Sequence, residues 1–406
     1  MASSKWKTFQ ELEGILAVKK LVFWGATNWI ERTLENIQGT PEFIVDKSKL
    51  NQDIKYNGCE VFSPDRLKEE NQVYVVITTA NYISVIEDLE KIGYIMGDDF
   101  CCTPLLNLRK SKDDLLSHSQ TLLISSPDHY SDKDSGGGLY KVKMNPYSIE
   151  KVYTGKTRGV SISNHLYYVV DMLKGLVVLD YQFNEIDIIE LEKNSEPHGI
   201  FVDNENKLIY VGSSGRDSVT VYSVQTKKKV NEYFISNKWK RNKKDNHHVN
   251  DPYVYGDSLY VSLFSFSGNW MNEVYDGGVL EIDLVDGKVL GPVITDKWMP
   301  HSVMRVDGKL TILDSMLGEL YHGSYAMACK INGFARGLCY DGKYFYIGAT
   351  EHRYPEKLVN ISTNISLDTG FYVFDSNSSM TKFFSMPNIQ SIHSILSLEE
   401  KNNNMN

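Results

Sequence analysis

A pattern that recurs along the C-terminal two-thirds of the chain constrains the fold more than any other feature. In residues 333–351, GFARGLCYDGKYFYIGATE, the pair Arg336-Gly337 opens a short apolar segment, Asp341-Gly342 forms a turn, and an aromatic-rich segment follows. Copies of this order, with variations, begin at five other positions: Arg158, His198, His248, His301 and His393. The last copy is cut short, because only one apolar segment follows before the polar end of the chain.

Repeats of this kind are typical of a β-propeller, in which each copy supplies one blade of about four strands. The copies begin 35–57 residues apart, so six of them predict a six-bladed β-propeller over residues 121–400. Because the last copy lacks outer strands, we expect residues 121–152 to complete its blade, which closes the ring and removes open sheet edges. Residues 401–406 are expected to form a disordered tail.

The first 105 residues have a different pattern, in which apolar segments alternate with helical ones. Residues 20–24, 43–46 and 73–77 read as strands, and this alternation predicts an α/β domain with a parallel sheet. Gly25 follows the first strand and Asp46 ends the second. Residues 106–120 are polar and charged, and we expect them to form a linker.

Composition excludes several classes of function. A net charge of −9 argues against a general nucleic-acid surface. Neither a signal peptide nor an apolar run long enough to cross a membrane is evident, so we expect a cytoplasmic protein without a membrane partner. The five cysteines are odd in number and show no CxxC pair, which favours free thiols. The sequence leaves a homo-oligomer open.

In a propeller, the residues at the entrance of each blade's first strand converge on the central axis. Four of the ten histidines occupy this register, together with two arginines. The candidate metal ligands are His198, His248, His301 and His393. Neutral imidazoles suit a divalent transition metal such as Zn, Mn, Fe or Ni. Asp251 or Asp314 would be carboxylate partners of the imidazoles.

Arg158 and Arg336 are the candidate residues for clamping a carboxylate, a phosphate or a sugar acid. Glu351 is the candidate general acid/base, and the alternative for it is a surface ion pair with Arg353. Trp270 either stacks on a sugar ring or packs on its own blade. The alternative for the whole set is a channel lining with ordered water. His247 precedes His248 in the sequence and should point away from the axis, because adjacent side chains of an extended segment point to opposite sides. Five histidines are expected at the surface or in turns: His118, His129, His165, His322 and His352.

Three stretches, HHVND at 247–251, PHS…DS…GEL at 300–320 and GFARGL at 333–338, together resemble an uncharacterised bacterial six-bladed propeller family. That resemblance implies the fold and no activity. More distantly, the layout is similar to the gluconolactonase and regucalcin group and to the peptide-amidating lyase, whose histidines hold a divalent metal. The calcium ligands of the gluconolactonases have no obvious counterpart here.

Residues 18–105 resemble the Rossmann-like domain that accompanies bacterial sugar-modifying enzymes. The resemblance implies nucleotide contacts by Gly25 and Asp46. Thr27 and Ile30 stand where that motif has further glycines, so an empty scaffold domain is the alternative.

These observations lead us to expect a metal-assisted enzyme (a lyase, epimerase or hydrolase) acting on an anionic sugar or nucleotide-sugar. Bacterial surface-glycan metabolism, including polysaccharide biosynthesis, is the expected setting. The alternative is a non-catalytic propeller that binds a glycan or a protein, with the α/β domain as a docking module.

Overall fold

A computed structural model of the protein describes residues 6–52, 54–70, 72–323, 325–359, 361 and 365–398. The expected tail at 401–406 lies outside these residues. The chain divides into two compact units, residues 1–114 and 115–406, and the division falls within helix α4 (Asn107–Ser117). Within the described part of the chain, no helix combines the length and apolar composition that a membrane crossing requires.

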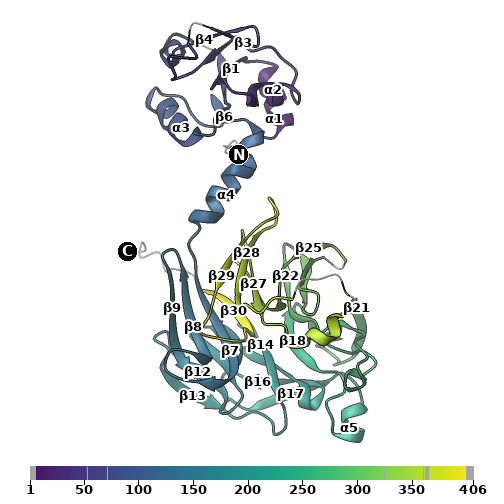
Figure 1. Ribbon diagram of the computed structural model, residues 1–406. Coiled ribbons are helices and arrows are strands. Elements are labelled where there is room, and N and C mark those ends of the chain that lie inside the picture. Colours follow the sequence, from purple (N-terminus) through teal and green to yellow (C-terminus); the bar gives the residue numbers. More distant parts are fainter. Residues whose placement is uncertain are drawn as a thin grey trace. The chain divides into compact units, whose positions relative to one another are not determined.

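The first unit is an α/β domain with a six-stranded mixed sheet, in the order β3-β4-β2-β1-β5-β6 (Figure 1). Its strands are β1 (Lys20–Trp24), β2 (Phe43–Val45), β3 (Lys55–Tyr56), β4 (Cys59–Phe62), β5 (Val73–Ile77) and β6 (Phe100–Cys102). Its helices are α1 (Phe9–Leu16), α2 (Trp29–Leu34), α3 (Tyr82–Lys91) and the 3-10 turns η1 (Pro64–Glu69) and η2 (Pro104–Leu106). All five residues of β5 are buried, because alternate side chains enter apolar clusters on opposite faces of the sheet.

The expected all-parallel sheet differs from the structure at β3, which pairs antiparallel with β4. Asn57 and Gly58 connect these strands with φ angles of 51° and 82°. Two successive positive φ angles are the requirement of a tight two-residue hairpin, and Asn-Gly is the sequence that meets it best. The local turn chemistry therefore adds one antiparallel strand to the parallel set.

The second unit is a six-bladed β-propeller, and each blade is a four-stranded antiparallel sheet (Figure 1). Blades one to three are β10 (Thr157–Ser163), β11 (Leu166–Asp171), β12 (Gly175–Leu179), β13 (Glu185–Ile189); β14 (Pro197–Asp203), β15 (Leu208–Ser213), β16 (Ser218–Ser223), β17 (Lys229–Phe234); and β18 (Val249–Tyr255), β19 (Ser258–Leu263), β20 (Gly277–Asp283), β21 (Val289–Lys297). Blades four to six are β22 (His301–Val306), β23 (Lys309–Asp314), β24 (Glu319–His322), β25 (Met327–Lys330); β26 (Phe334–Tyr340), β27 (Phe345–Thr350), β28 (Gly370–Asp375), β29 (Met380–Ser385); and β30 (Ser394–Leu398), β7 (Thr121–Ser131), β8 (Gly136–Met144), β9 (Tyr147–Thr154). The connections also contain α5 (Lys238–Asn242), η3 (Ser214–Arg216), η4 (Trp270–Asn272) and η5 (Pro355–Leu358).

The ring closes where the two ends of this unit meet. β30, from the C-terminal end, pairs antiparallel with β7, with Ile395 opposite Ile124 (Figure 1). The sixth blade is thus assembled from residues 121–154 and 394–398. No described blade is left with an unpaired innermost strand, and the closure joins segments far apart in the sequence.

Apolar clusters between neighbouring blades form the core of the propeller. Adjacent residues of one strand enter different clusters: Val169 packs toward blade six, whereas Val170 packs toward blade two. This alternation follows from the two-residue period of a strand. Neighbouring blades therefore pack with their apolar faces together, and the polar side chains of the innermost strands lie near the central axis.

Candidate functional site

A β-bulge in the innermost strand of each of the first five blades positions the axial residues. The register shifts between Thr157 and Val160, Pro197 and Ile200, Val249 and Pro252, His301 and Met304, and Ala335 and Leu338. A bulge leaves residues out of the ladder and redirects their side chains. The bulged pairs are Arg158-Gly159, His198-Gly199, Asn250-Asp251, Ser302-Val303 and Arg336-Gly337.

This geometry corrects the register expected from the sequence in two blades. Arg158, His198 and Arg336 lie within their bulges, but His248 precedes the bulge of blade three by two residues and His301 that of blade four by one. Asn250 and Ser302 occupy the positions that were expected for the two histidines.

The four histidines nevertheless lie close together. The ring centre of His198 is 4.9 Å from that of His248 and 5.7 Å from that of His393, and the centres of His301 and His393 are 6.3 Å apart. The side chains of His198, His301 and His393 are almost wholly buried, at 2%, 1% and 2% exposure. Burial, followed by the nearby charge of Arg158 for His198 and of Arg336 for the other two, lowers the pKa of each imidazole well below its ordinary value. All three are therefore neutral at neutral pH.

The hydrogen bonds of these rings differ. Nδ1 of His198 and both ring nitrogens of His393 are buried without a hydrogen-bond partner. His301 is fully engaged: its Nδ1 lies 2.9 Å from the Met299 carbonyl and 2.8 Å from Ser315 Oγ, and Arg336 Nε donates to its Nε2 at 3.1 Å. Buried nitrogens without partners are costly, so His198 and His393 are the imidazoles with unused capacity to bind.

His248 is oriented by a carboxylate that the sequence analysis did not name. Its Nδ1 lies 2.6 Å from Asp245 Oδ2, which leaves Nε2 as the free nitrogen. Trp270 packs on the His248 ring at 4.4 Å between centres, and its Nε1 donates to the Asp245 carbonyl. Trp270 thus takes the packing alternative. His247 bonds Ser236 and Ser265 and points away from the axis, as expected.

The expected carboxylate partners of the imidazoles lie elsewhere. Asp251 accepts from the Ser302 backbone N–H at 2.6 Å, and burial raises its pKa. It lines a second cavity of about 170 Å³ between the inner strands, next to His393. Asp314 accepts from the Trp298 N–H, and burial raises its pKa to about 6. Neither carboxylate forms a hydrogen bond to a histidine in the described structure.

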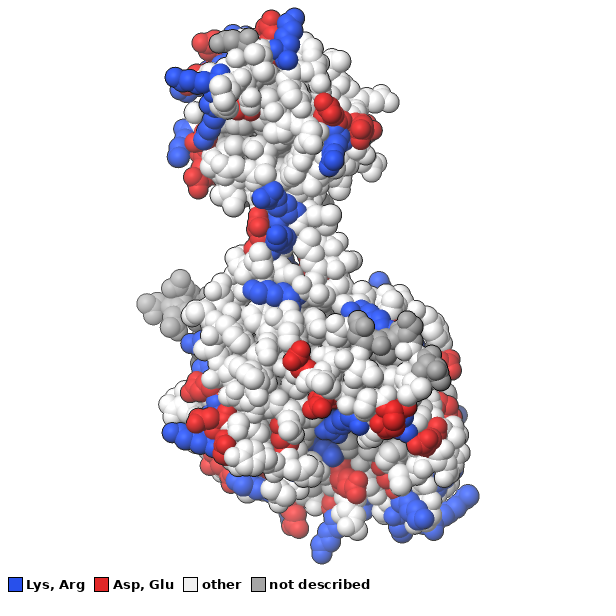
Figure 2. All heavy atoms as spheres, viewed as in Figure 1, with Lys and Arg blue, Asp and Glu red and all other residues white. Residues whose placement is uncertain are grey.

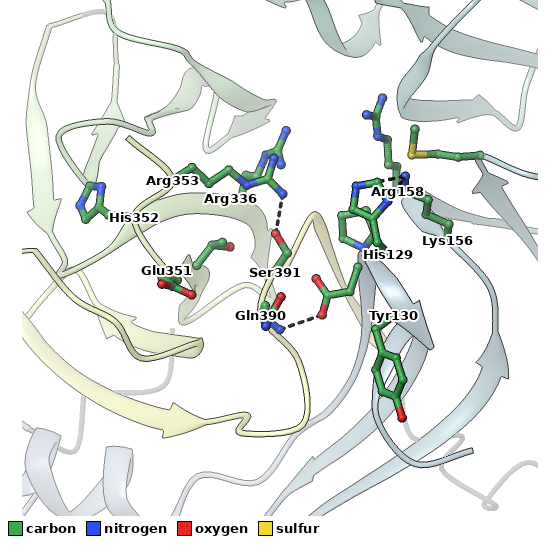
Figure 3. Close-up of a pocket in the computed structure, with 14 residues that line it drawn as sticks. His129, Tyr130, Lys156, Arg158, Arg336, Glu351, His352, Arg353, Gln390 and Ser391 are labelled. Carbon is green, nitrogen blue, oxygen red and sulfur yellow. Dashed lines mark hydrogen bonds between the residues drawn. The ribbon is translucent and has the colours of Figure 1, made fainter. Parts of the chain in front are cut away.

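A larger cavity of about 540 Å³ opens beside the histidines and is rich in cations (Figure 3). Arg336 is buried, Arg158 is half-buried and Arg353 is exposed at the mouth. In Figure 3, Arg336 and Arg353 lie together, and Arg158 faces them with Lys156 and His129 at its side. The full lining is Pro127, Asp128, His129, Tyr130, Lys156, Arg158, Met172, Arg336, Thr350, Glu351, His352, Arg353, Gln390 and Ser391.

The three guanidinium groups bond neutral partners. Arg158 Nη1 donates to the Pro197 carbonyl at 2.8 Å, Arg353 Nη2 to Ser391 Oγ at 2.7 Å, and Arg336 to His301. Among the described residues, none of the three forms an ion pair with a carboxylate. Burial, and then the charge of Arg353, lowers the pKa of Arg158 to about 10 and that of Arg336 well below its ordinary value. The cavity therefore concentrates positive charge that no ion pair among the described residues neutralises.

The described acidic residues of this cavity form no ion pair with its arginines. Glu351 is exposed, and among the described residues it forms no ion pair with Arg353. Asp128 Oδ2 accepts from the Gln390 backbone N–H at 2.7 Å, and burial raises its pKa. Figure 2 shows acidic and basic residues intermixed over the face of the propeller unit that it presents, in contrast to the cationic cavity.

Several lining residues were missed by the sequence analysis. His129 is exposed, as expected, and also lines the arginine cavity, whereas His352 was expected at the surface or in a turn but is buried in the lining of that cavity. The other three fit the expectation more closely: His165 is exposed, while His118 and His322 bond Tyr346 and Thr311 within the blades. The order of the strands within the blades was the signal that could have identified these lining residues. β7 is the second strand of blade six, so its end lies at the same level as residues 350–353 of blade five.

Within the part of the chain that the structure describes, no three His, Cys, Asp or Glu side chains are grouped so as to hold a metal ion. The five cysteines are free, as predicted.

In the first unit, Gly25 and Asp46 lie together at the end of β1. Gly25 has a φ of 110°, and a Cβ there would lie 3.0 Å from that of Thr79. Asp46 Oδ2 accepts from the Ala26 N–H at 2.8 Å and from Asn51, and Oδ1 accepts from the Ser48 N–H. The carboxylate thus occupies the backbone donor that a nucleotide phosphate would use at this turn.

Comparisons with known proteins bear on the fold. A family described as a domain of unknown function (DUF4915) matches residues 234–405. No curated protein matches the chain. Similar solved structures include a nidogen/laminin complex, with 11% identity over 68% of this chain and 97% of the other and a TM-score of 0.46. Hydrazine synthase of Kuenenia stuttgartiensis has 16% identity over 66% and 95%, with a TM-score of 0.41.

The calcium-binding protein regucalcin of Agrobacterium tumefaciens has 12% identity over 59% of this chain and 76% of the other, with a TM-score of 0.43. At such identities these likenesses concern the fold and carry no conclusion about activity. The chain is a six-bladed β-propeller with a mixed-sheet α/β domain before it.

Proposed function

We propose that the propeller is an enzyme that acts on a small anionic, sugar-like molecule bound in the arginine cavity. One observation carries the proposal: Arg158, Arg336 and Arg353 share one cavity without a carboxylate partner among the described residues. Unpaired cations in a partly buried site repel one another and are poorly solvated. A bound carboxylate or phosphate supplies the missing charge and accepts paired N–H bonds from the guanidinium forks.

The proposed roles follow from depth in the cavity. Arg158 and Arg353 bind the anionic group nearer the mouth, while Arg336 binds it from the buried side and holds His301 in its Nδ1–H tautomer. Glu351 lines the same cavity without an arginine partner, which supports it as the general acid/base. In this proposal the enzyme is a lyase, epimerase or hydrolase, and its substrate belongs to surface-glycan metabolism.

A divalent transition metal at the axis belongs to the same proposal. His198, His248 and His393 would be its ligands: the described side chains are not grouped as a metal site, but the His198 ring lies near the other two, these rings have unused nitrogens, and Asp245 fixes the tautomer of His248. A bound metal supplies Lewis-acid polarisation of a substrate oxygen or a bound water of lowered pKa. His301 is left out of this set, because both of its nitrogens are used by the protein.

A Rossmann-like nucleotide site at Gly25 and Asp46 is a separate proposal for the first unit. The bond between the Asp46 carboxylate and the Ala26 N–H supports its alternative, an α/β scaffold without a nucleotide.

The test is thermal stabilisation by a panel of sulfate, phosphate, sugar acids, sugar phosphates and nucleotide-sugars, because a ligand that binds only the folded state raises the melting temperature. Arg353→Gln should abolish the shift. Arg305→Gln is the matched control, since Arg305 bonds the Gly308 carbonyl and stacks on Tyr255 away from the cavity. NMR of each stabilising sugar with the protein then detects turnover. Stabilisation without turnover would favour the non-catalytic binding protein, and no stabilisation by any anion would refute the cavity's role.

A further inference from the structure

Lys156 and His129 form a pair of basic groups at the mouth of the arginine cavity. Lys156 lies in the short connection between β9 and β10, and His129 lies near the end of β7. Lys156 Nζ is 3.0 Å from His129 Nδ1, and both side chains line the cavity beside Arg158 (Figure 3). Two strands of blade six and the entrance of blade one thus bring an amine and an imidazole to one side of the proposed ligand site.

The surroundings of Lys156 destabilise its ammonium form relative to that of a lysine in water. Among the described residues it forms no ion pair with a carboxylate, and its hydrogen-bond partner is an imidazole that accepts as well as donates. Burial, followed by the charges of Arg158 and Arg353, lowers the pKa of Lys156. The titratable and charged groups that face the cavity are Asp128, His129, Tyr130, Arg158, Arg336, Glu351, His352 and Arg353.

We propose that Lys156 and His129 are the proton-transfer pair of the arginine cavity, loading a proton when a dianion binds. This inference rests on the proposed anion site. Binding brings negative charge to Nζ, so the amine takes one proton from solvent or from a hydroxyl of the ligand and becomes an ammonium ion. His129 then accepts a hydrogen bond from that ammonium ion at Nδ1. In the reverse direction Lys156 returns the proton to the bound molecule. Neither residue was singled out by the repeat pattern.

The first experiment measures the protonation of the Lys156 amine in the protein without ligand. The rate at which acetic anhydride acylates Lys156 is followed against pH by peptide mass spectrometry, with the exposed Lys193 as internal reference. Only the free amine reacts, so we expect the Lys156 profile to lie at lower pH than that of Lys193. Arg353→Gln should move the Lys156 profile to higher pH, because it removes one of the two named cations. Coincident profiles for Lys156 and Lys193 would overturn the proposal.

The second experiment measures proton uptake on binding. Sulfate, which does not titrate near neutral pH, is titrated into the full chain by calorimetry between pH 7 and 10 in two buffers of different ionisation enthalpy. We expect up to one proton taken up per sulfate bound. Lys156→Arg keeps the positive charge but cannot exchange a proton, so this variant should bind sulfate without proton uptake. His129→Gln keeps a hydrogen-bond acceptor beside Lys156, so this variant should retain the proton uptake.

The outcomes separate the two proposals. Sulfate binding without proton uptake by the wild type would overturn the Lys156–His129 pair and leave the anion site standing. Absence of sulfate binding would count against the anion site, while the acylation profile would still decide the state of Lys156.

Discussion

Replacing Arg158 by methionine should stabilise the protein in the absence of ligand. Arg158 is half-buried, contacts the Pro197 carbonyl and faces other guanidinium groups, and its pKa is lowered from 12.5 to about 10 by burial and by Arg353. Methionine keeps much of the aliphatic volume and carries no charge. The substitution removes an electrostatic cost that the folded protein bears and the unfolded chain does not.

The size of the effect follows from linkage. The folded-state pKa is below the unfolded value, so at pH 7, below both, the cation is retained and its full cost is present. That cost disappears only as the pH rises through about 10. A shift of this size corresponds to ~3 kcal/mol. Losing the hydrogen bond to the Pro197 carbonyl costs ~1–2 kcal/mol. We therefore expect Arg158→Met to gain about 1–2 kcal/mol.

Arg216→Met is the matched control, because the same change breaks a partnered arginine. Arg216 donates to both carboxylate oxygens of Glu232 at 2.7 and 2.9 Å. Burial raises the pKa of Glu232, but bonds from Arg216 and Lys229 outweigh it and lower the pKa to about 2. Removing Arg216 leaves a mostly buried carboxylate without its main partner, which should cost about 3 kcal/mol.

The assay is urea unfolding of the full chain at pH 7, with and without sulfate, from which the free energies of unfolding of wild type and both variants are compared. The expected signs are opposite for the two variants, and sulfate should stabilise wild type but not Arg158→Met. Equal losses of stability in both variants would refute the claim that Arg158 is an uncompensated cation.

Three further predictions concern a close backbone contact, the pH dependence of stability and the metal content of the protein. Gly199→Ala would place a Cβ 2.0 Å from Asp251 Oδ1, so this change should lower the free energy of unfolding in urea by ~2–3 kcal/mol. Gly14→Ala in helix α1 is the control: no atom lies within 4 Å of the added Cβ, so this change should raise the free energy of unfolding by up to ~1 kcal/mol. Asp314 has a pKa raised to about 6 by burial, so stability should fall as the pH rises from about 4 to about 6; Asp314→Asn should flatten this part of the stability profile, and an unchanged profile would contradict the assignment. Protein purified without a metal-affinity tag should contain about one Zn, Mn, Fe or Ni by elemental analysis, which His198→Ala/His393→Ala should lose and His301→Ala should retain; a metal-free wild type after supplementation would remove the metal from the proposed function.

The propeller was predictable from the sequence because each blade repeats one local pattern. Turns such as Asp341-Gly342 and the alternation of apolar residues recur, and the single strand after His393 requires a partner from residues 121–152. The hairpin at Asn57-Gly58 carried an equally local signal, but the sequence analysis predicted no strands on either side of it. Short-range chemistry thus specified most of the fold.

The site was less predictable, because it depends on register and on convergence. The bulges shift Asn250 and Ser302 into the positions expected for His248 and His301, and no residue pattern announces where a bulge begins. Asp245 reaches His248 from a loop, and Lys156, in the connection between β9 and β10, meets His129 near the end of β7. Arg158 and Arg336 were found because their position within the repeat is the bulge itself.

The most direct test of the anion site is the crystal structure of the protein grown with selenate, located by anomalous scattering at the selenium edge. The proposal predicts one selenate in the cavity, with its oxygens within hydrogen-bond distance of at least two of the guanidinium groups of Arg158, Arg336 and Arg353. A cavity without selenate at saturating concentration, with these arginines paired to carboxylates of the protein, would contradict it.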